Sequence, residues 1–289
     1  MRIGISPFGH TRDGSFAVAD AAVEGGIDTF WLGEGLLEME QFPRWSGGME
    51  PLTWLAFLAG RYPGVRVGLG ASVLPLRDVQ WLAKQSSTLD NLTGGNHVLA
   101  VAPGFWRHEF EYRGVDFDRR GAIFGELLDG LIAAFAGDEY SSEHLRLAPG
   151  HRLSPRPLDG VRPQLWLAGA AGTQRKALAR GLPFQARAAT PAELAPTVEG
   201  WKARGGGVFG LRIAVELAEL PQHAAHLSGS KIVGPAQYIA DQLRAYARIG
   251  VDDVSLIPGN DDESSLRTTR ALVNEVLPAL GELLARDAA

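Results

Sequence analysis

A turn of small residues follows a short apolar run near the middle of the chain. Residues 164–168 read Gln-Leu-Trp-Leu-Ala and predict a strand, and helical spacing resumes after the turn. The turn itself consists of Gly169, Ala170, Ala171, Gly172 and Thr173. Its small side chains leave the first backbone N–H groups of the helix accessible, and the helix dipole favours an anion there. The pattern therefore predicts a site for the phosphate of a cofactor.

Three residues in predicted loops could carry protons. His10 follows the first predicted strand, Glu34 the second and Glu109 the fourth. Carboxyl and imidazole groups are the usual side chains for acid–base catalysis, so each is a candidate. The alternatives are a solvated loop histidine at His10, and helix capping or a salt bridge at Glu34.

Aromatic residues gather in the loop after the fourth predicted strand, where Phe105 and Trp106 follow Gly104. Both rings could stack on a flat ring system, with ordinary packing as the alternative. The loop also contains His108 and Glu109, but no second histidine lies one helical turn away. Metal-binding helices need such a pair, so no metal site is expected.

The composition argues against several classes of partner. The formal net charge is −5, whereas nucleic-acid surfaces cluster Lys and Arg, so no nucleic-acid partner is expected. No apolar run reaches the roughly 18 residues of a membrane span, and the first residues lack a charged leader with an apolar core. We therefore expect a soluble, cytoplasmic protein. The absence of cysteine excludes disulfides, thiolate catalysis and Cys-ligated metals.

Eight short apolar segments alternate with segments of helical spacing. They are Ile3–Ser6, Thr29–Leu32, Val65–Val73, Val98–Ala102, Leu165–Ala168, Phe184–Ala188, Leu211–Val215 and Val254–Ile257. Their near-continuous hydrophobic character is typical of parallel strands buried on both faces. Eight such units predict an α/β fold, a (β/α)8 TIM barrel. A doubly wound open sheet shows the same alternation and is the structural alternative.

No linker divides the chain, so a single domain over residues 1–289 is expected. Residues 137–163 depart from the alternation, because they are rich in Pro, Gly and Ser and too long for an ordinary connection. They predict an insertion before the fifth strand. Tyr140 and Leu145-Arg146-Leu147 are its possible hairpin strands.

Local signals predict where helices begin and end. Ser15 can cap the first helix, and Gly25-Gly26 can close it. Gly234-Pro235 begins the seventh helix, with proline in the first turn. The acidic run Asp261-Asp262-Glu263 is expected to cap a helix or face solvent.

Several separated motifs occur along the chain in the order typical of one family. They are Ala22-x-x-Gly25-Gly26-Ile27-Asp28-x-Phe30-Trp31-Leu32-Gly33, Thr88-Leu89-Asp90-x-Leu92-x-x-Gly95, Gly104-x-x-x-x-Glu109-Phe110-x-x-x-Gly114-x-x-Phe117-x-x-Arg120, Leu165-Trp166-Leu167-Ala168-Gly169, Val233-Gly234-Pro235, Ile249-Gly250-Val251-Asp252-Asp253-Val254 and Glu275-Val276-Leu277-Pro278. With them the chain resembles the luciferase-like monooxygenase superfamily, which contains flavin monooxygenases related to bacterial luciferase and oxidoreductases that use the deazaflavin coenzyme F420. The ordered set spans nearly the whole chain.

The resemblance implies a (β/α)8 barrel, usually dimeric, with a flavin or deazaflavin ring over the barrel mouth. Several such enzymes carry a non-proline cis peptide after the third strand, in a bulge that supports the ring, and Ser72-Val73 occupies that position. The family also places the cofactor phosphate near the loops after the fourth, fifth and sixth strands. Gly104 and the turn at 169–173 are the contacts this implies.

Two departures from the family bear on function. Many members have an acidic residue or Glu-His after the second strand, where this chain has Glu34-Gly35, and the Pro221–Lys231 connection is short for a substrate lid. The chain is also shorter than many flavin monooxygenases, and this length together with the short connection favours the F420 branch, with hydride transfer to or from a small organic substrate and a proton from Glu34, His10 or Glu109. A monooxygenase using reduced FMN and oxygen is the first alternative, and a non-catalytic flavin-binding protein is the second.

Overall fold

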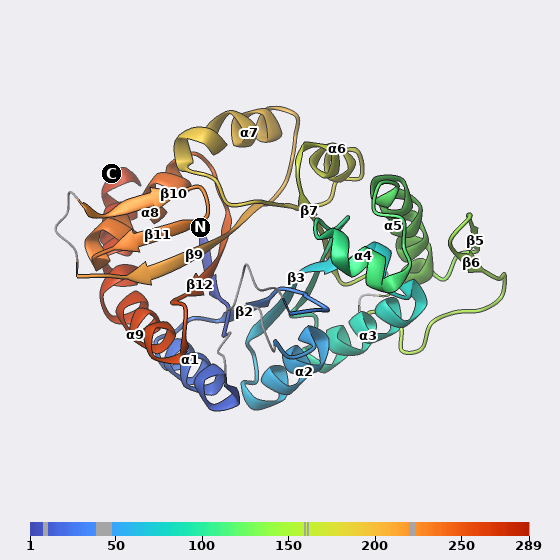
Figure 1. Cartoon of the computed structure of the whole chain (residues 1–289), viewed down its shortest axis with the longest axis horizontal. Helices are drawn as coiled ribbons and strands as arrows, with labels where there is room; N and C mark the ends of the chain where they lie inside the picture. Colours follow the sequence, from blue (N-terminus) through green and yellow to red (C-terminus); the bar gives the residue numbers. More distant parts are fainter. Residues whose placement is uncertain (8–10, 39–47, 159, 161, 220–223, 289) are drawn as a thin grey trace. The chain divides into compact units, whose positions relative to one another are not determined.

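The parallel strands of this chain form a closed sheet. The structure is a computed structural model that describes residues 1–7, 11–38, 48–158, 160, 162–219 and 224–288. The parallel strands follow one another in the order β1, β2, β3, β4, β7, β8, β9 and β12, and β12 pairs with β1. With helices between the strands, this is the predicted (β/α)8 barrel (Figure 1), so the open-sheet alternative is excluded.

Each strand of the barrel overlaps one of the eight predicted segments. All four residues of β2 are buried, as expected for a parallel strand that is covered on both faces. The barrel strands are β1 Arg2–Ile5, β2 Thr29–Leu32, β3 Arg66–Val73, β4 His97–Ala102, β7 Gln164–Gly169, β8 Phe184–Ala186, β9 Phe209–Leu217 and β12 Asp253–Pro258. The shorter strands are β5 Tyr140–Ser141, β6 Arg146–Leu147, β10 His226–Ser228 and β11 Lys231–Gly234.

The helices begin close to the predicted positions, with one cap misplaced. They are α1 Arg12–Glu24, α2 Pro51–Arg61, α3 Val79–Leu92, α4 Arg107–Arg113, α5 Arg120–Ala136, α6 Ala171–Ala179, α7 Pro191–Ala203, α8 Ala236–Arg248, α9 Asp262–Ala271 and α10 Leu277–Ala288, with a 3-10 turn η2 at Leu74–Leu76 and a π-helical turn η4 at Leu272–Val276. The prediction of Ser15 as the cap of α1 is wrong. The helix begins one turn earlier, where the Thr11 hydroxyl accepts a hydrogen bond from the Gly14 N–H at 3.0 Å.

The other predicted helix boundaries lie at or within one residue of the observed ones. Gly25 ends α1, and Asp261 caps α9 in a capping box with Ser264. Pro235 occupies the N-cap position of α8, one residue before the predicted first turn.

The described residues group into two compact units. One contains residues 1–31 and 178–289, and there α1 packs against α9 and α8 against α10. The other contains residues 32–38 and 49–177, in which α3 packs against both α2 and α5. The expectation of a single domain remains a prediction.

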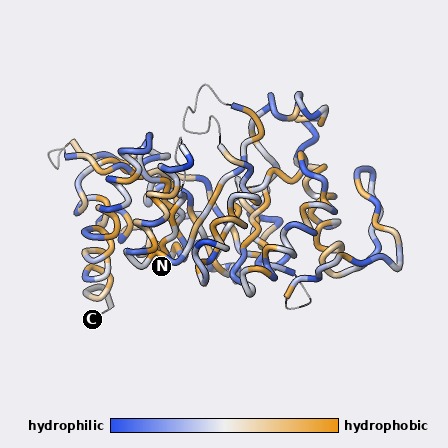
Figure 2. Tube along the Cα trace, turned by 90° about the horizontal axis from the view of Figure 1, so that it is seen from below, coloured by the Kyte–Doolittle hydropathy of each residue, from blue (hydrophilic) through white to orange (hydrophobic). Residues whose placement is uncertain are grey.

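The segment before β7 contains the predicted hairpin. β5 and β6 pair antiparallel, and the hairpin extends from α5, with a hydrophilic tip (Figures 1 and 2). The side chains of Leu145 and Tyr140 pack closely against α5 at Gly130. A Cβ on this glycine would lie 2.3 Å from Leu145 and 3.1 Å from Tyr140. The Tyr140 hydroxyl also donates to the Glu126 carbonyl at 2.8 Å. The insertion is therefore a packed extension of α5.

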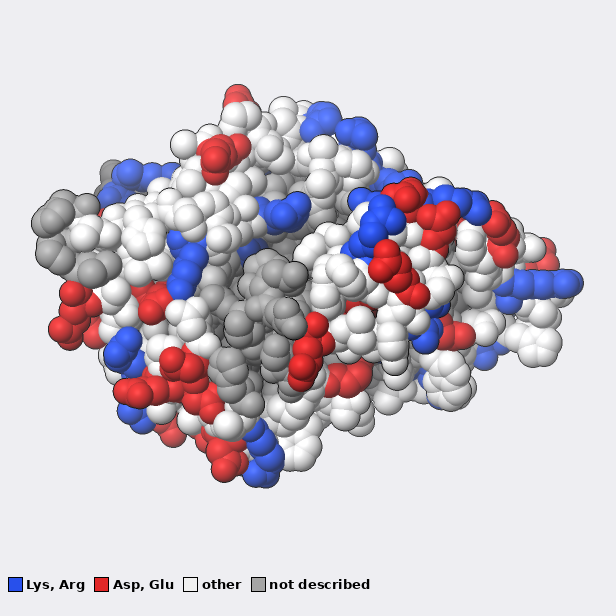
Figure 3. Space-filling view, in the orientation of Figure 1, with Lys and Arg blue, Asp and Glu red and all other residues white. Residues whose placement is uncertain are grey.

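The charged side chains of the second unit pair with one another locally. Over α4 and α5, Figure 3 shows acidic and basic groups interspersed. Two of the pairs are Arg107 with Asp118 and Arg119 with Glu143, both at 2.7 Å. No helix in the described part of the chain combines the length and the apolar character that crossing a bilayer requires.

The turn after α7 offers a stability test in the first unit. Trp201 is fully buried against Phe184 and Phe209, and a Cβ on Gly206 would lie 2.3 Å from its indole. Because the ring has no room to move, we expect Gly206→Ala to lower the free energy of unfolding by about 1–3 kcal/mol in denaturant titrations. Gly207→Ala is the matched control, since its Cβ would have no atom within 4 Å. Equal stabilities of the two variants would contradict this packing argument.

Candidate cofactor site

Three neighbouring strands of the second unit end at one edge. β3 pairs in parallel with β4 up to Val73 and Ala102, and β4 pairs in parallel with β7 up to Val101 and Leu167. The chain segments that leave these strands therefore start side by side. In (β/α)8 barrels the functional residues come from this carboxyl-terminal edge.

The end of β3 carries a local irregularity. The peptide bond Gly70–Ala71 is cis, and the pairing with β4 shifts register between Gly70 and Ser72. The prediction of this bond at Ser72-Val73 is wrong by two residues. Ser72 and Val73 both pair regularly with β4, so the bulge falls on Ala71, which has no partner in that ladder.

Glu34 holds the end of β3 from the neighbouring segment. One carboxylate oxygen, Oε1, accepts the Val73 N–H at 3.2 Å. The other, Oε2, accepts the Ser72 hydroxyl at 3.0 Å and two guanidinium N–H groups of Arg77 at 3.0 and 2.7 Å. The side chain of Glu34 is 9% exposed, so these partners replace most of its contact with water. The arrangement favours an anchoring role over proton transfer.

Arg77 joins Glu34 to a second carboxylate. It lies directly after η2 and contacts Glu50 Oε1 at 2.7 Å. Glu50 is the N-cap of α2, and its other oxygen accepts the Thr53 N–H at 2.8 Å. Burial alone would lower the pKa of Arg77, but its hydrogen bonds to Glu34 and Glu50 outweigh that effect and raise it.

Sequence reasoning missed Arg77 and Glu50. One signal was present, because Arg77 is the sole Lys or Arg between Arg66 and Lys84, in an otherwise apolar stretch that follows a strand. A lone cation there indicates an acidic partner. The identity of that partner depends on which strands become neighbours.

Glu109 anchors the segment that follows β2. It lies in the first turn of α4 and is 3% exposed. Its Oε1 accepts the Leu36 N–H at 2.6 Å, and the Leu37 N–H is a second donor. Burial raises the pKa of this carboxyl, the two backbone hydrogen bonds lower it, and the nearby charge of Glu34 raises it again, with a net increase. A buried carboxyl of this kind can hold a proton at higher pH than an exposed one.

Gly104 allows the loop after β4 to approach β3 closely. Its φ is +81°, a left-handed conformation, and a Cβ there would lie 2.6 Å from Val73 and 2.8 Å from Phe110. The two aromatic residues that follow differ in exposure, since Phe105 is 68% exposed and Trp106 is half-buried. The ring of Trp106 packs tilted against His108, with centroids 5.7 Å apart. Phe105 therefore offers an open aromatic face beside Gly104.

The predicted phosphate turn lies where β7 passes into α6. Gly169 has a φ of +147°, and a Cβ on it would lie 3.0 Å from the Thr173 hydroxyl oxygen. The Ala170 carbonyl accepts the N–H groups of Thr173 and Gln174 at 2.9 and 3.0 Å, which begins the helix. Ala171 and Gly172 are exposed in its first turn, where N–H groups have no partner within the helix.

The structure brings several of the predicted site residues together. Ser72, Val73 and Gly104 lie together with Glu34, and the turn at 169–173 follows the strand next to β4. His10 lies outside the described residues.

Among the described residues, one group has the composition of a metal site: Glu126, Glu143 and His144, between α5 and the hairpin. Arg119 already contacts both oxygens of Glu143, at 3.1 and 2.7 Å. The expectation of no metal site remains a prediction.

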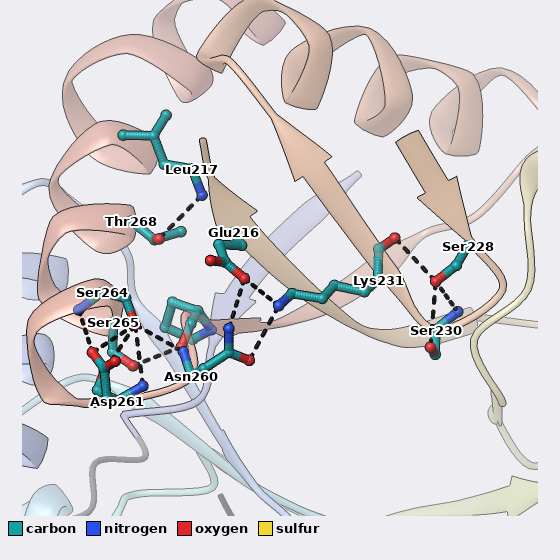
Figure 4. Close-up of polar contacts among 11 residues, drawn as sticks. Glu216, Leu217, Ser228, Ser230, Lys231, Asn260, Asp261, Ser264, Ser265 and Thr268 are labelled. Carbon is teal, nitrogen blue, oxygen red and sulfur yellow. Dashed lines mark hydrogen bonds and ion pairs between the residues drawn. The ribbon is translucent and has the colours of Figure 1, made fainter. Parts of the chain in front are cut away.

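A second polar cluster lies in the first unit, at the carboxyl ends of β9 and β12 (Figure 4). The Lys231 ammonium contacts Glu216 and the amide oxygen of Asn260, and Asn260 donates to Glu216 at 2.7 Å. Thr268 accepts the Leu217 N–H at 3.2 Å. The contact of Lys231 with Glu216 fastens β11, which sequence reasoning did not predict, to β9.

The raised pKa of Glu109 gives a testable pH dependence. The folded protein binds this proton more tightly than the unfolded chain, so the carboxyl favours folding at low pH and costs stability as the pH rises through its folded pKa. Glutamine does not titrate. We therefore expect Glu109→Gln to gain stability relative to the wild type, in denaturant unfolding, as the pH rises above the ordinary glutamate pKa of about 4.3.

The matched control for that experiment is Glu111→Gln, which removes one charge from the exposed side of the same helix. A stability difference between Glu109→Gln and wild type that stays constant with pH would contradict the assignment.

The chain matches the family model described as luciferase-like monooxygenase over residues 11–218. It is 30% identical over 150 residues to uncharacterized protein y4vJ of Sinorhizobium fredii, which covers 51% of this chain and 41% of that protein. It is 25% identical over 159 residues to the oxygenase component of a flavin-dependent trigonelline monooxygenase from Acinetobacter baylyi, which covers 54% of this chain and 42% of that protein. The chain thus matches about two fifths of the length of these curated relatives.

Solved structures share the fold over nearly all of the chain. Monooxygenase RslO1 from Streptomyces bottropensis has a TM-score of 0.78 at 20% identity, covering 96% of this chain and 99% of that chain. The oxygenating constituent of 3,6-diketocamphane monooxygenase from Pseudomonas putida, in complex with FMN, has a TM-score of 0.74 at 13% identity, covering 96% and 98%. The coenzyme F420-dependent tetrahydromethanopterin reductase from Methanopyrus kandleri has a TM-score of 0.76 at 13% identity, covering 96% and 99%.

The family match contains all three strand ends that form the candidate site. Residues 11–218 include the end of β3, the loop after β4 and the turn after β7. They make up well over half of the chain. The chain belongs to the luciferase-like monooxygenase family.

Proposed function

We propose that this protein is an oxidoreductase that binds the deazaflavin coenzyme F420 and transfers a hydride to or from a small organic substrate. Family membership supports the reaction class. The observation that carries the finer proposal is Glu109, a buried carboxyl with a raised pKa at the strand edge where the cofactor residues gather. Hydride transfer to a carbonyl or imine carbon needs a proton as well, and such a carboxyl can supply one.

The turn after β7 fits the phosphate end of such a cofactor. A side chain on Gly169 would crowd the Thr173 hydroxyl, so the glycine keeps this position open for a ligand. Gln174, in the same turn of helix, is 8% exposed, and its Nε2 has no hydrogen-bond partner among the described residues. The hydroxyl, this amide and the N–H groups of Ala171 and Gly172 would hold the phosphate.

The ends of β3 and β4 fit the ring end. Ser72 and Val73 would support the ring from β3, and Gly104 lets the loop after β4 approach Val73 closely. Phe105 and Trp106 would stack on the ring and exclude water. When bound, the cofactor supplies two-electron redox chemistry by hydride transfer.

The protein groups then have separate tasks. Glu109 is the candidate proton carrier, and its pKa is raised chiefly because it is buried. Both oxygens of Glu34 are engaged with β3 and Arg77, so Glu34 would orient the site rather than exchange protons. His10 is a further candidate that lies outside the described residues. A homodimer, which the family resemblance implies, is part of the same proposal.

A monooxygenase that uses FMN is the second candidate. It is favoured by the match to the flavin-dependent trigonelline monooxygenase component. The apolar residues around Phe105 would in that case keep water from a reactive flavin. A protein that binds flavin without turnover is the third possibility, which activity assays separate from the other two.

Titration of the purified protein with F420 and with FMN tests the proposal. We expect micromolar binding of F420, followed by substrate-dependent oxidation or reduction of the bound cofactor, read from its absorbance. Binding of FMN alone, with oxygen uptake coupled to substrate, would overturn the F420 proposal in favour of the monooxygenase. Binding of neither cofactor would overturn both.

Substitution in the phosphate turn gives a matched mutational test. We expect Gly169→Val to weaken cofactor binding at least about tenfold, or about 1.4 kcal/mol, because its side chain fills the position beside Thr173. Thr173→Val, which removes the hydroxyl and preserves shape, should weaken binding in the same direction. Gly181→Ala is the control for a side chain at positive φ, since it lies beyond the other end of α6 with open space around it. Unchanged affinity in both turn variants would exclude this phosphate site.

A further inference from the structure

We propose that Arg77 is a positioning residue for the cofactor site, which keeps the end of β3 in place through Glu34. This inference rests on the proposed function, because the end of β3 affects the cofactor only if the ring is supported there. Arg77 touches neither Gly104 nor the turn at 169–173 in any described contact. It acts through a chain of neighbours that the structure shows link by link.

The first link is the ion pair of Arg77 with Glu34. Two guanidinium N–H groups, from Nε and Nη2, reach the same oxygen of Glu34 at 3.0 and 2.7 Å. The side chains are 22% and 9% exposed, so the pair is shielded from most of the solvent. Nη2 also reaches Glu50, which is fixed as the cap of α2. Arg77 therefore has its position set from two sides.

The second link runs from Glu34 to the backbone of β3. Its Oε1 accepts the Val73 N–H, and its Oε2 accepts the Ser72 hydroxyl. These are the last two residues of the strand that pair with β4. A carboxylate that turned away would leave the Val73 N–H without its partner at the strand end, where the register has already shifted.

The third link carries the effect across to β4. Val73 lies so close to Gly104 that a Cβ on the glycine would be 2.6 Å from its methyl group. Val73 also packs in one apolar cluster with Leu76 and Phe110. A shift of Val73 therefore changes both the β3 and the β4 sides of the ring position.

Charge explains why the arginine is needed. Three carboxylates face this region: Glu34 from the segment after β2, Glu50 from the start of α2 and Glu109 from α4. Glu34 and Glu109 repel each other, since the charge of Glu34 raises the pKa of Glu109. Arg77 is the cation that the described contacts give to Glu34 and Glu50. Without it, the charge on Glu34 is left shielded from water and beside like charges.

A double-mutant cycle tests the proposal. The variants are Arg77→Met, Glu34→Gln and the pair together, and Arg77→Lys is the conservative replacement. Arg119→Met is the matched control, because Arg119 makes an equally close pair with Glu143 on the exposed surface of the same unit. Each variant is measured for F420 and FMN affinity, for hydrogen exchange of the peptide that contains the Val73 amide, and for Tm.

We expect Arg77→Met to weaken cofactor binding by about tenfold and to speed exchange at the end of β3 by at least as much. Glu34→Gln added to Arg77→Met should recover most of both losses, because a neutral amide oxygen still accepts the Val73 N–H without the unpaired charge. Arg77→Lys should lie between wild type and Arg77→Met. Arg119→Met should resemble wild type in affinity and in exchange of this peptide.

Two results would overturn the proposal. One is an Arg77→Met variant whose Val73 exchange and cofactor affinity stay within about twofold of wild type, which is less than a typical neighbour coupling. The other is a double variant no better than Arg77→Met, which would make Arg77 a general stabiliser. If the wild type binds neither cofactor, the proposed function fails, and hydrogen exchange alone still decides the role of Arg77.

Discussion

At the candidate site of this protein, carboxylates accept backbone N–H groups at the end of one parallel strand and in the segment that follows another. Glu34 accepts the Val73 N–H, and Glu109 accepts the Leu36 N–H. An ionised carboxylate can accept hydrogen bonds but cannot donate them, so each one selects the donors that face it. The segment after β2 is thus tied to the end of β3 by Glu34 and to the first turn of α4 by Glu109. The backbone at this end of the strands is therefore held by the carboxylates of Glu34 and Glu109 and by the charges around them.

The two carboxylates share a region but not an environment. Glu34 lies against a guanidinium that has a second anchor at Glu50, whereas Glu109 is buried and meets backbone N–H groups with another carboxylate nearby. In many acid–base sites, different environments give two residues of the same type different pKa values. Glu34 holds the end of β3, whereas Glu109 holds the segment after β2 and also has a raised pKa.

The sequence predicted the features that depend on local patterns. Continuous apolar runs indicated the eight strands, and a stretch rich in turn residues indicated the hairpin before β7. The prediction failed at the start of α1, where two nearby residues could each cap the helix. Thr11 and Ser15 both carry hydroxyls, and the choice between them as cap depends on Asp262, which contacts Thr11 from α9.

Features that depend on distant residues escaped prediction. The pairing of Arg77 with Glu34 joins positions 43 residues apart, and nothing at either position alone identifies the other. The same holds for β11, whose attachment to β9 involves Lys231 and Glu216. The cis bond was expected after the third strand, at Ser72-Val73, whereas it lies two residues earlier, where the pairing of β3 with β4 shifts register.

The contrast between Gly104 and Phe105 has a consequence for how such a protein can diversify. Any side chain at position 104 would collide with Val73 and Phe110, so selection can change that position only together with its neighbours. The next residue projects a largely exposed ring and has no such constraint. A substitution at residue 105 would therefore change the surface offered to a ligand without disturbing the packing of Val73 and Phe110 around Gly104.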